Sequence, residues 1–122
     1  MKLYFYVIGF SLLTFSCTKD KAMKEVNSNS CVTDITTVSY TNDIQPILNI
    51  SCSVSGCHNA GNGAIPEYIN YTNLKNDVDN GKINDRVFVQ GDMPPSYTTA
   101  PTLSQCDLDK IQAWIDNGAP NN

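Results

Sequence analysis

The sequence predicts an all-α domain over residues 31–122, preceded by an export signal and a short tether. Three observations predict this fold. A segment near the C-terminal end carries an N-cap and an apolar face at helical spacing, and a second such segment precedes a cysteine cluster. The connecting stretches are rich in Gly, Asn and Pro and show no strand signal that would build a sheet.

Length and composition limit the classes of function that the chain can have. The chain has 122 residues, with 8 Lys or Arg against 12 Asp or Glu and a formal net charge of -4. Its 41% hydrophobic and 16% charged residues are typical of a folded protein rather than a disordered one. The acidic balance opposes a phosphate backbone, so we expect no nucleic-acid partner. A core this small is commonly completed by a metal, a cofactor or a cross-link.

The first 16 residues read as a signal peptide. Lys2 supplies a positive charge, and Leu3 to Phe15 form an apolar run that is too short for a membrane-spanning helix. The run ends in Ser16-Cys17, and the sequence around it resembles the lipobox of bacterial lipoproteins, although Thr14 and Phe15 depart from the usual residues there. We expect cleavage before Cys17 and lipidation of its thiol. The alternative is an ordinary secretory signal that is cut elsewhere.

Residues 17–30 are polar and predict a tether between the lipid and the domain. Removal of residues 1–16 leaves 106 residues with 7 basic and 12 acidic groups, a net charge of -5. We therefore expect a periplasmic or cell-surface lipoprotein whose partner is not acidic. This compartment is oxidising, which bears on the remaining cysteines.

Three helices and one ambiguous segment are predicted in the domain. A helix should begin at Thr41 to Asp43, tolerate Pro46 in its first turn, and end at the cysteine cluster. A shorter helix is predicted over 72–80, with Gly81 after it, whereas 83–89 is ambiguous. Residues 59–66 and 91–101 should be irregular.

The last helix has the strongest signals. Ser104 is a good N-cap, and Asp107 three residues later can complete a capping box. Gly118 should end the helix at the position after its C-cap. One apolar face is expected from Leu108, Ile111, Trp114 and Ile115, with Leu103 and Leu108 at the positions of a hydrophobic staple.

The segment from Cys52 to His58 carries the chemistry. Two cysteines followed at once by a histidine are the order needed for covalent haem c, in which each thiol adds to a vinyl group and the imidazole reaches the iron. Four residues separate Cys52 and Cys57 instead of the usual two, and Ser55-Gly56 can supply the flexibility of the wider loop. The alternative is a small disulfide between Cys52 and Cys57 with His58 on the surface.

The second iron ligand should be Met93. After removal of the signal, Met23 in the tether and Met93 are the two methionines. Pro94 and Pro95 follow Met93 and restrict it to an extended loop, which suits a side chain aimed at a metal better than a side chain filling the core. If these ligands hold haem and Cys17 is lipidated, Cys31 and Cys106 remain, and we expect a disulfide between them. Two separate thiols are the alternative.

These motifs together resemble a small class I cytochrome c domain, in particular its lipoprotein forms. The resemblance covers residues 38–120 and rests on four separated motifs in order. These are 40–48, the Cys52–His58 cluster, 91–95 and 103–119. It implies a compact helical fold around one haem c, with His58 and Met93 on the two faces of the iron and the first and last helices crossing beside it. It also implies single-electron transfer with redox protein partners rather than enzymatic catalysis.

Two other classes stay open at this point. Cys52, Cys57, His58 and Cys106 form a Cys3His set for a structural zinc site, which would make the chain a structural or binding lipoprotein without haem, stabilised by zinc or by disulfides. Alternatively, a haem protein in which Met93 does not bind the iron would offer a site for gas or peroxide. With one histidine, no Ser-His-Asp triad exists apart from the cysteine cluster.

Overall fold

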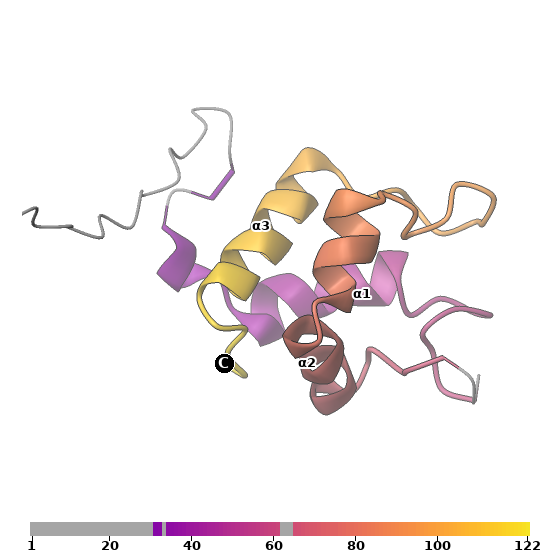
Figure 1. Cartoon of the computed structure of the whole chain (residues 1–122), viewed down its shortest axis with the longest axis horizontal. Coiled ribbons are helices and arrows are strands. Elements are labelled where there is room, and N and C mark those ends of the chain that lie inside the picture. Colours follow the sequence, from indigo (N-terminus) through magenta and orange to yellow (C-terminus); the bar gives the residue numbers. More distant parts are fainter. Residues whose placement is uncertain (1–30, 33, 62–64) are drawn as a thin grey trace, which may run out of the picture.

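The structure is a computed structural model and describes residues 31–32, 34–61 and 65–122. The predicted signal peptide, the tether and Cys17 lie outside these residues. Six helical segments and no strand occur in the described part of the chain, which confirms the all-α class (Figure 1). The first segment is a single 3-10 turn, η1 (Ile35–Thr37). No helix among the described residues is long and apolar enough to cross a membrane.

The first long helix consists of η2 (Tyr40–Ile44) and α1 (Gln45–Ser51), which run on without a break. Its N-cap is Ser39, whose Oγ accepts a hydrogen bond from the Asn42 amide at 3.3 Å. Asp43 Oδ2 accepts in return from the Ser39 amide at 3.0 Å. The helix therefore begins at Tyr40, slightly before the predicted start. In η2 the turn is wider than in an α-helix, because the Ile44 amide bonds to the Ser39 carbonyl at 3.2 Å.

The middle of the chain forms two helices. The predicted second helix is α2 (Tyr71–Asp79), with Asn70 as its N-cap and Leu74 buried. It ends before Gly81, which has a φ of +74°, a conformation that glycine adopts without strain. The ambiguous segment is helical as η3 (Asn84–Val89). Its turns are also wide, and the Gln90 amide bonds to the Asp85 carbonyl at 2.8 Å.

The last helix is α3 (Gln105–Asp116), and it has the predicted capping box between Ser104 and Asp107. Gly118 follows its C-cap with a φ of +86°. Trp114 is 1% exposed and Ile111 5%, as expected for the apolar face. Leu108, which the sequence places on the apolar face, is only half-buried, whereas Ala113 is buried. The buried face of α3 is therefore rotated about the helix axis relative to the predicted one.

An aromatic cluster joins three helices at the centre of the core. The Tyr40 ring stacks on Trp114 of α3 with centroids 5.9 Å apart, and Tyr71 of α2 meets Tyr40 edge-on at 5.0 Å. At the surface, Lys110 Nζ of α3 lies 3.0 Å from Asp43 Oδ1 of η2. The Ser39 amide and Lys110 together hold the pKa of Asp43 below its ordinary value. The helix of η2 and α1 thus packs across α3 (Figure 1).

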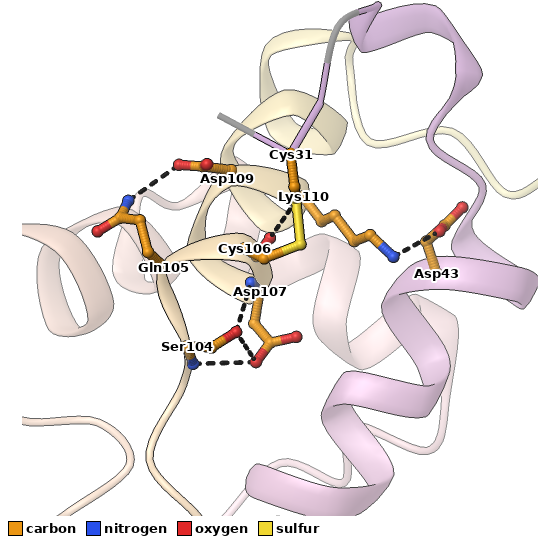
Figure 2. Close-up of a disulfide and its surroundings, with 8 residues drawn as sticks. All are labelled: Cys31, Asp43, Ser104, Gln105, Cys106, Asp107, Asp109 and Lys110. Atoms are coloured by element: carbon orange, nitrogen blue, oxygen red, sulfur yellow. Dashed lines mark hydrogen bonds and ion pairs between the residues drawn. A yellow bond between two sulfur atoms is a disulfide. The ribbon is translucent and has the colours of Figure 1, made fainter. Parts of the chain in front are cut away.

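A disulfide joins Cys31 to Cys106 in the first turn of α3, with 5.4 Å between the Cα atoms (Figure 2). This is the pairing that the sequence predicts. It attaches the entry of the domain to its last helix. The capping box of α3 and the Lys110–Asp43 pair lie on the same part of the helix (Figure 2).

Candidate functional site

A cavity of about 510 Å³ lies among α1, α2, η3, α3 and the loop that carries Met93. Its volume falls in the range of small-molecule and cofactor pockets, about 300–1,000 Å³. Most of the wall is apolar, and its innermost members include Ile44, Leu48, Leu74, Ile83, Ile111 and Trp114. Cys52, Cys57, His58 and Met93 all line this one cavity. The structure therefore brings together the four residues that the sequence predicts for haem.

The end of α1 positions the cysteine loop. Cys52 is the C-cap of α1, and its amide bonds to the Leu48 carbonyl at 2.9 Å. The loop then turns back, because the His58 amide donates to the Cys52 carbonyl at 3.0 Å. Gly56 has a φ of +82°, which glycine adopts without strain. The four residues between the cysteines are thus accommodated by a closed turn that returns His58 to the end of the helix.

The two cysteines of this loop are not joined in a disulfide. The small Cys52–Cys57 bridge that the sequence left open is therefore not present in the structure. Burial, and to a lesser degree the nearby Cys57 thiol, raise the pKa of Cys52 to about 11. At neutral pH the Cys52 side chain is consequently a protonated thiol beside an apolar cavity.

The imidazole ring of His58 has a hydrogen-bond partner at one edge and an aromatic ring against one face. Its Nδ1 lies 2.8 Å from the carbonyl oxygen of Pro66. A carbonyl only accepts, so Nδ1 carries the hydrogen and Nε2 keeps a lone pair for a metal. This is the usual arrangement of metal-binding histidines. The ring also stacks on Tyr68, with centroids 3.9 Å apart and planes within 7° of parallel.

The Met93 loop is fastened to η3. The Arg86 carbonyl accepts the amides of Asp92 at 3.1 Å and Met93 at 3.3 Å. The Arg86 guanidinium also forms an ion pair with the Asp92 carboxylate, with Nη2 and Oδ2 2.7 Å apart. These contacts fix the residue just before Met93, while Pro94 and Pro95 follow it along the cavity wall.

A polar network beside His58 was not predicted from the sequence. The Tyr68 hydroxyl donates to Asp77 Oδ2 at 2.8 Å, and Lys82 Nζ lies 2.9 Å from Asp77 Oδ1. Burial and the bond to Asp77 raise the pKa of Tyr68, so the phenol remains a donor. Tyr68 and Asp77 have no helical spacing to His58 or Met93 that could have identified them before the fold was known.

The alternative zinc set does not come together. It requires Cys106 as a thiolate, and the structure places this sulfur in the disulfide with Cys31. In the part of the chain that the structure describes, no group of three or more His, Cys, Asp or Glu side chains is arranged to hold a metal ion.

The donor set at the cavity fits haem c. Two thiols stand on one loop, an imidazole follows them with Nε2 available, and a thioether is held on a separate loop. The apolar wall suits the porphyrin, and Lys82 and Arg86 are the basic residues at the cavity. Comparison of the chain with known protein families, with curated proteins and with solved structures finds no match.

Proposed function

We propose that the chain is a monohaem c-type cytochrome that transfers single electrons outside the cytoplasm. Cys52 and Cys57 would form the thioether bonds, and His58 and Met93 would bind the two faces of the iron. One observation carries this proposal: residues 35 positions apart in the sequence, His58 and Met93, line the same apolar cavity as both thiols. The fold would then be that of the cytochrome c family.

Each side chain has a defined part in this proposal. The thiols of Cys52 and Cys57 would hold the haem by adding to its two vinyl groups, each sulfur bonding to one carbon while its hydrogen goes to the neighbouring carbon. The Pro66 carbonyl keeps His58 in the tautomer that binds metal. The Arg86 and Asp92 contacts hold the loop that presents Met93.

With His58 and Met93 both bound, the iron would have no open position for substrate, which favours electron transfer over catalysis on a bound molecule. The bound haem supplies an iron that gains or loses one electron. A thioether opposite an imidazole favours the reduced state, so the reduction potential should be relatively high. The apolar residues of the cavity exclude water and support the same tendency.

The cellular setting is part of the proposal. Residues 1–16 would direct export, Cys17 would carry the lipid, and residues 17–30 would tether the domain to a bacterial membrane. The Cys31–Cys106 disulfide accords with an oxidising periplasm or cell surface. Redox proteins would be the donor and the acceptor.

The test is the visible spectrum, with a haem stain of a denaturing gel, of the chain expressed beside a cytochrome c maturation system. We expect a Soret band and a stain that survives denaturation. Both should be lost in Cys52→Ser/Cys57→Ser. Ser53→Ala is the matched control, because Ser53 Oγ lies in the same loop and finds no hydrogen-bond partner among the described residues. A colourless product from a host that haems a control cytochrome would contradict the proposal and return attention to a lipoprotein without haem.

Met93→Ala then tests the distal ligand. The oxidised protein should lose the absorbance of the Met–iron bond, and the potential should fall because the thioether is gone. Haem should stay covalently attached, because Met93 takes no part in the thioether bonds. If the unsubstituted protein lacks this absorbance and binds carbon monoxide readily, the site is instead one for a gas or peroxide.

A further inference from the structure

The contact between Tyr68 and His58 is closer than ordinary core packing requires. The two rings are 3.9 Å apart and nearly parallel, and Tyr68 is 7% exposed. The Tyr68 amide also donates to the His58 carbonyl at 3.0 Å, so the backbone and the ring of Tyr68 both meet His58. Together with the Pro66 carbonyl on Nδ1, these contacts restrain the orientation of the imidazole.

Tyr68 is in turn held by Asp77. The Tyr68 hydroxyl donates to one carboxylate oxygen at 2.8 Å, and Lys82 Nζ pairs with the other at 2.9 Å. Asp77 is 6% exposed, and burying a carboxylate is costly unless it is paired and hydrogen-bonded. Asp77 lies on the buried face of α2, where its neighbour Leu74 is apolar and packs into the core. Core packing alone would be served better by an apolar residue.

We propose that Tyr68 is a positioning residue, anchored by Asp77, that fixes the plane of the His58 imidazole and thereby sets the electronic state of the iron. The inference rests on the proposed function. Groups that orient a metal ligand are known to tune the metal, because the rotation of an imidazole decides which iron orbitals its π system meets. Tyr68 binds neither iron nor substrate, and it acts through His58.

Three substitutions distinguish the effect of the Tyr68 ring from the effect of its hydrogen bond to Asp77. Tyr68→Phe keeps the ring and removes the bond to Asp77. Tyr68→Leu removes the ring itself. Tyr71→Phe is the matched control. Tyr71 is also a partly buried tyrosine, and its hydroxyl donates to the Ala119 carbonyl at 2.8 Å, yet it is not part of the cavity wall.

The readouts are the electron paramagnetic resonance spectrum of the oxidised protein and the reduction potential, both measured on the full haem-loaded chain. In Tyr68→Leu we expect the largest g value to shift and the potential to fall, because water gains access to His58. Tyr68→Phe should broaden the signal while His58 still binds. Tyr71→Phe should lower the thermal midpoint without changing either readout.

The outcomes distinguish the two proposals. If the chain carries no covalent haem, the proposed function fails and this inference fails with it. If haem is present and His58 binds it, but Tyr68→Leu and Tyr68→Phe keep the g values and the potential of the unsubstituted protein, the positioning role is wrong and the proposed function stands. Equal shifts in Tyr71→Phe would also overturn it, because they would trace to general loosening of the core.

Discussion

The two cysteines of the Cys52–His58 loop differ in their surroundings. Cys52 is the C-cap of α1 and packs against the hydrophobic core, whereas Cys57 comes later in the turn, next to His58. Burial raises the pKa of Cys52 to about 11, with a smaller contribution from Cys57. The reactive form of a thiol is the thiolate, so burial slows every reaction of Cys52 that proceeds through it.

Alkylation measures the effect of burial on the reactivity of Cys52. In the haem-free chain we expect Cys52 to react with iodoacetamide at pH 8 roughly ten to a hundred times more slowly than in the urea-unfolded chain, which serves as its control. The rate should rise as pH approaches 11. Mass spectrometry of the labelled peptide gives the rate, and equal rates in both states would contradict the burial.

The raised pKa of Cys52 also means that the folded state keeps a proton that the unfolded state loses. The free energy of unfolding should therefore decline as pH rises from about 9 to about 11.

At the level of helices, the local signals predicted the ends better than the faces. The start of α3 at the Ser104–Asp107 capping box and its end before Gly118 are as predicted. Both signals depend only on residues that are neighbours in the sequence. The burial of Ala113 in place of Leu108 depends on what α3 packs against, which periodicity alone does not show. The wide turns of η2 and η3 also lack a sequence signature, so residues 83–89 stayed ambiguous until the fold resolved them.

The link between η3 and the Met93 loop leads to a second prediction. Asp92→Asn removes the ion pair with Arg86 while the backbone bonds to the Arg86 carbonyl stay. An exposed pair of this kind contributes about 0.2–1 kcal/mol. We expect the Met–iron absorbance to disappear at a lower temperature, with little change in the midpoint of helix loss measured by circular dichroism.

Lys75→Gln is the control for this substitution. It breaks an ion pair of the same kind, between Lys75 and Asp79 on α2, away from the loop. The Met–iron absorbance should be lost at the usual temperature in this variant. If both variants lose it at the same reduced temperature, the Arg86–Asp92 pair has no special role in holding Met93.

Over the whole molecule, the cavity shows how far a sequence can locate a site. Cys52, Cys57 and His58 are recognisable because a local motif fixes them, and Met93 is recognisable because two prolines follow it. Their meeting at one cavity depends on the packing of η2 against α3 and on the course of η3. The Tyr68–Asp77 bond is purely tertiary, so neither residue is singled out by a pattern.

The Cys31–Cys106 disulfide closes a loop of 75 residues. In the chain-entropy model a loop of this length contributes about 4 kcal/mol. Cys31→Ser/Cys106→Ser should therefore lower the free energy of unfolding in urea by about that amount and leave haem attached to the other pair. Reductant added to the unsubstituted chain should produce a similar loss. A change below about 1 kcal/mol would show that this bridge is not an important constraint on the unfolded chain.

Acidic side chains outnumber basic ones in the domain. The described residues include four basic and ten acidic side chains, a net charge of -6. Each of the four basic side chains is in an ion pair with an aspartate, and the pairs are Lys75–Asp79, Lys82–Asp77, Arg86–Asp92 and Lys110–Asp43. The field of the domain is therefore negative, which favours a basic partner.

Small redox reagents test this field directly. Oxidation of the reduced protein by a cationic metal complex should slow several-fold as ionic strength rises from about 0.01 to 0.5 M, whereas oxidation by an anionic complex should accelerate. Stopped-flow absorbance gives both rates. Parallel responses, or none, would show that the charge does not act at the site of electron exchange.

Peptide mapping by mass spectrometry is the most direct test of the proposed haem attachment. After digestion of the matured protein, the peptide containing residues 52–58 should carry the mass of one haem, with both Cys52 and Cys57 consumed and no thiol left to alkylate. Recovery of this peptide with two unmodified thiols, or with a Cys52–Cys57 disulfide, from a host that matures a control cytochrome would contradict the electron-carrier proposal.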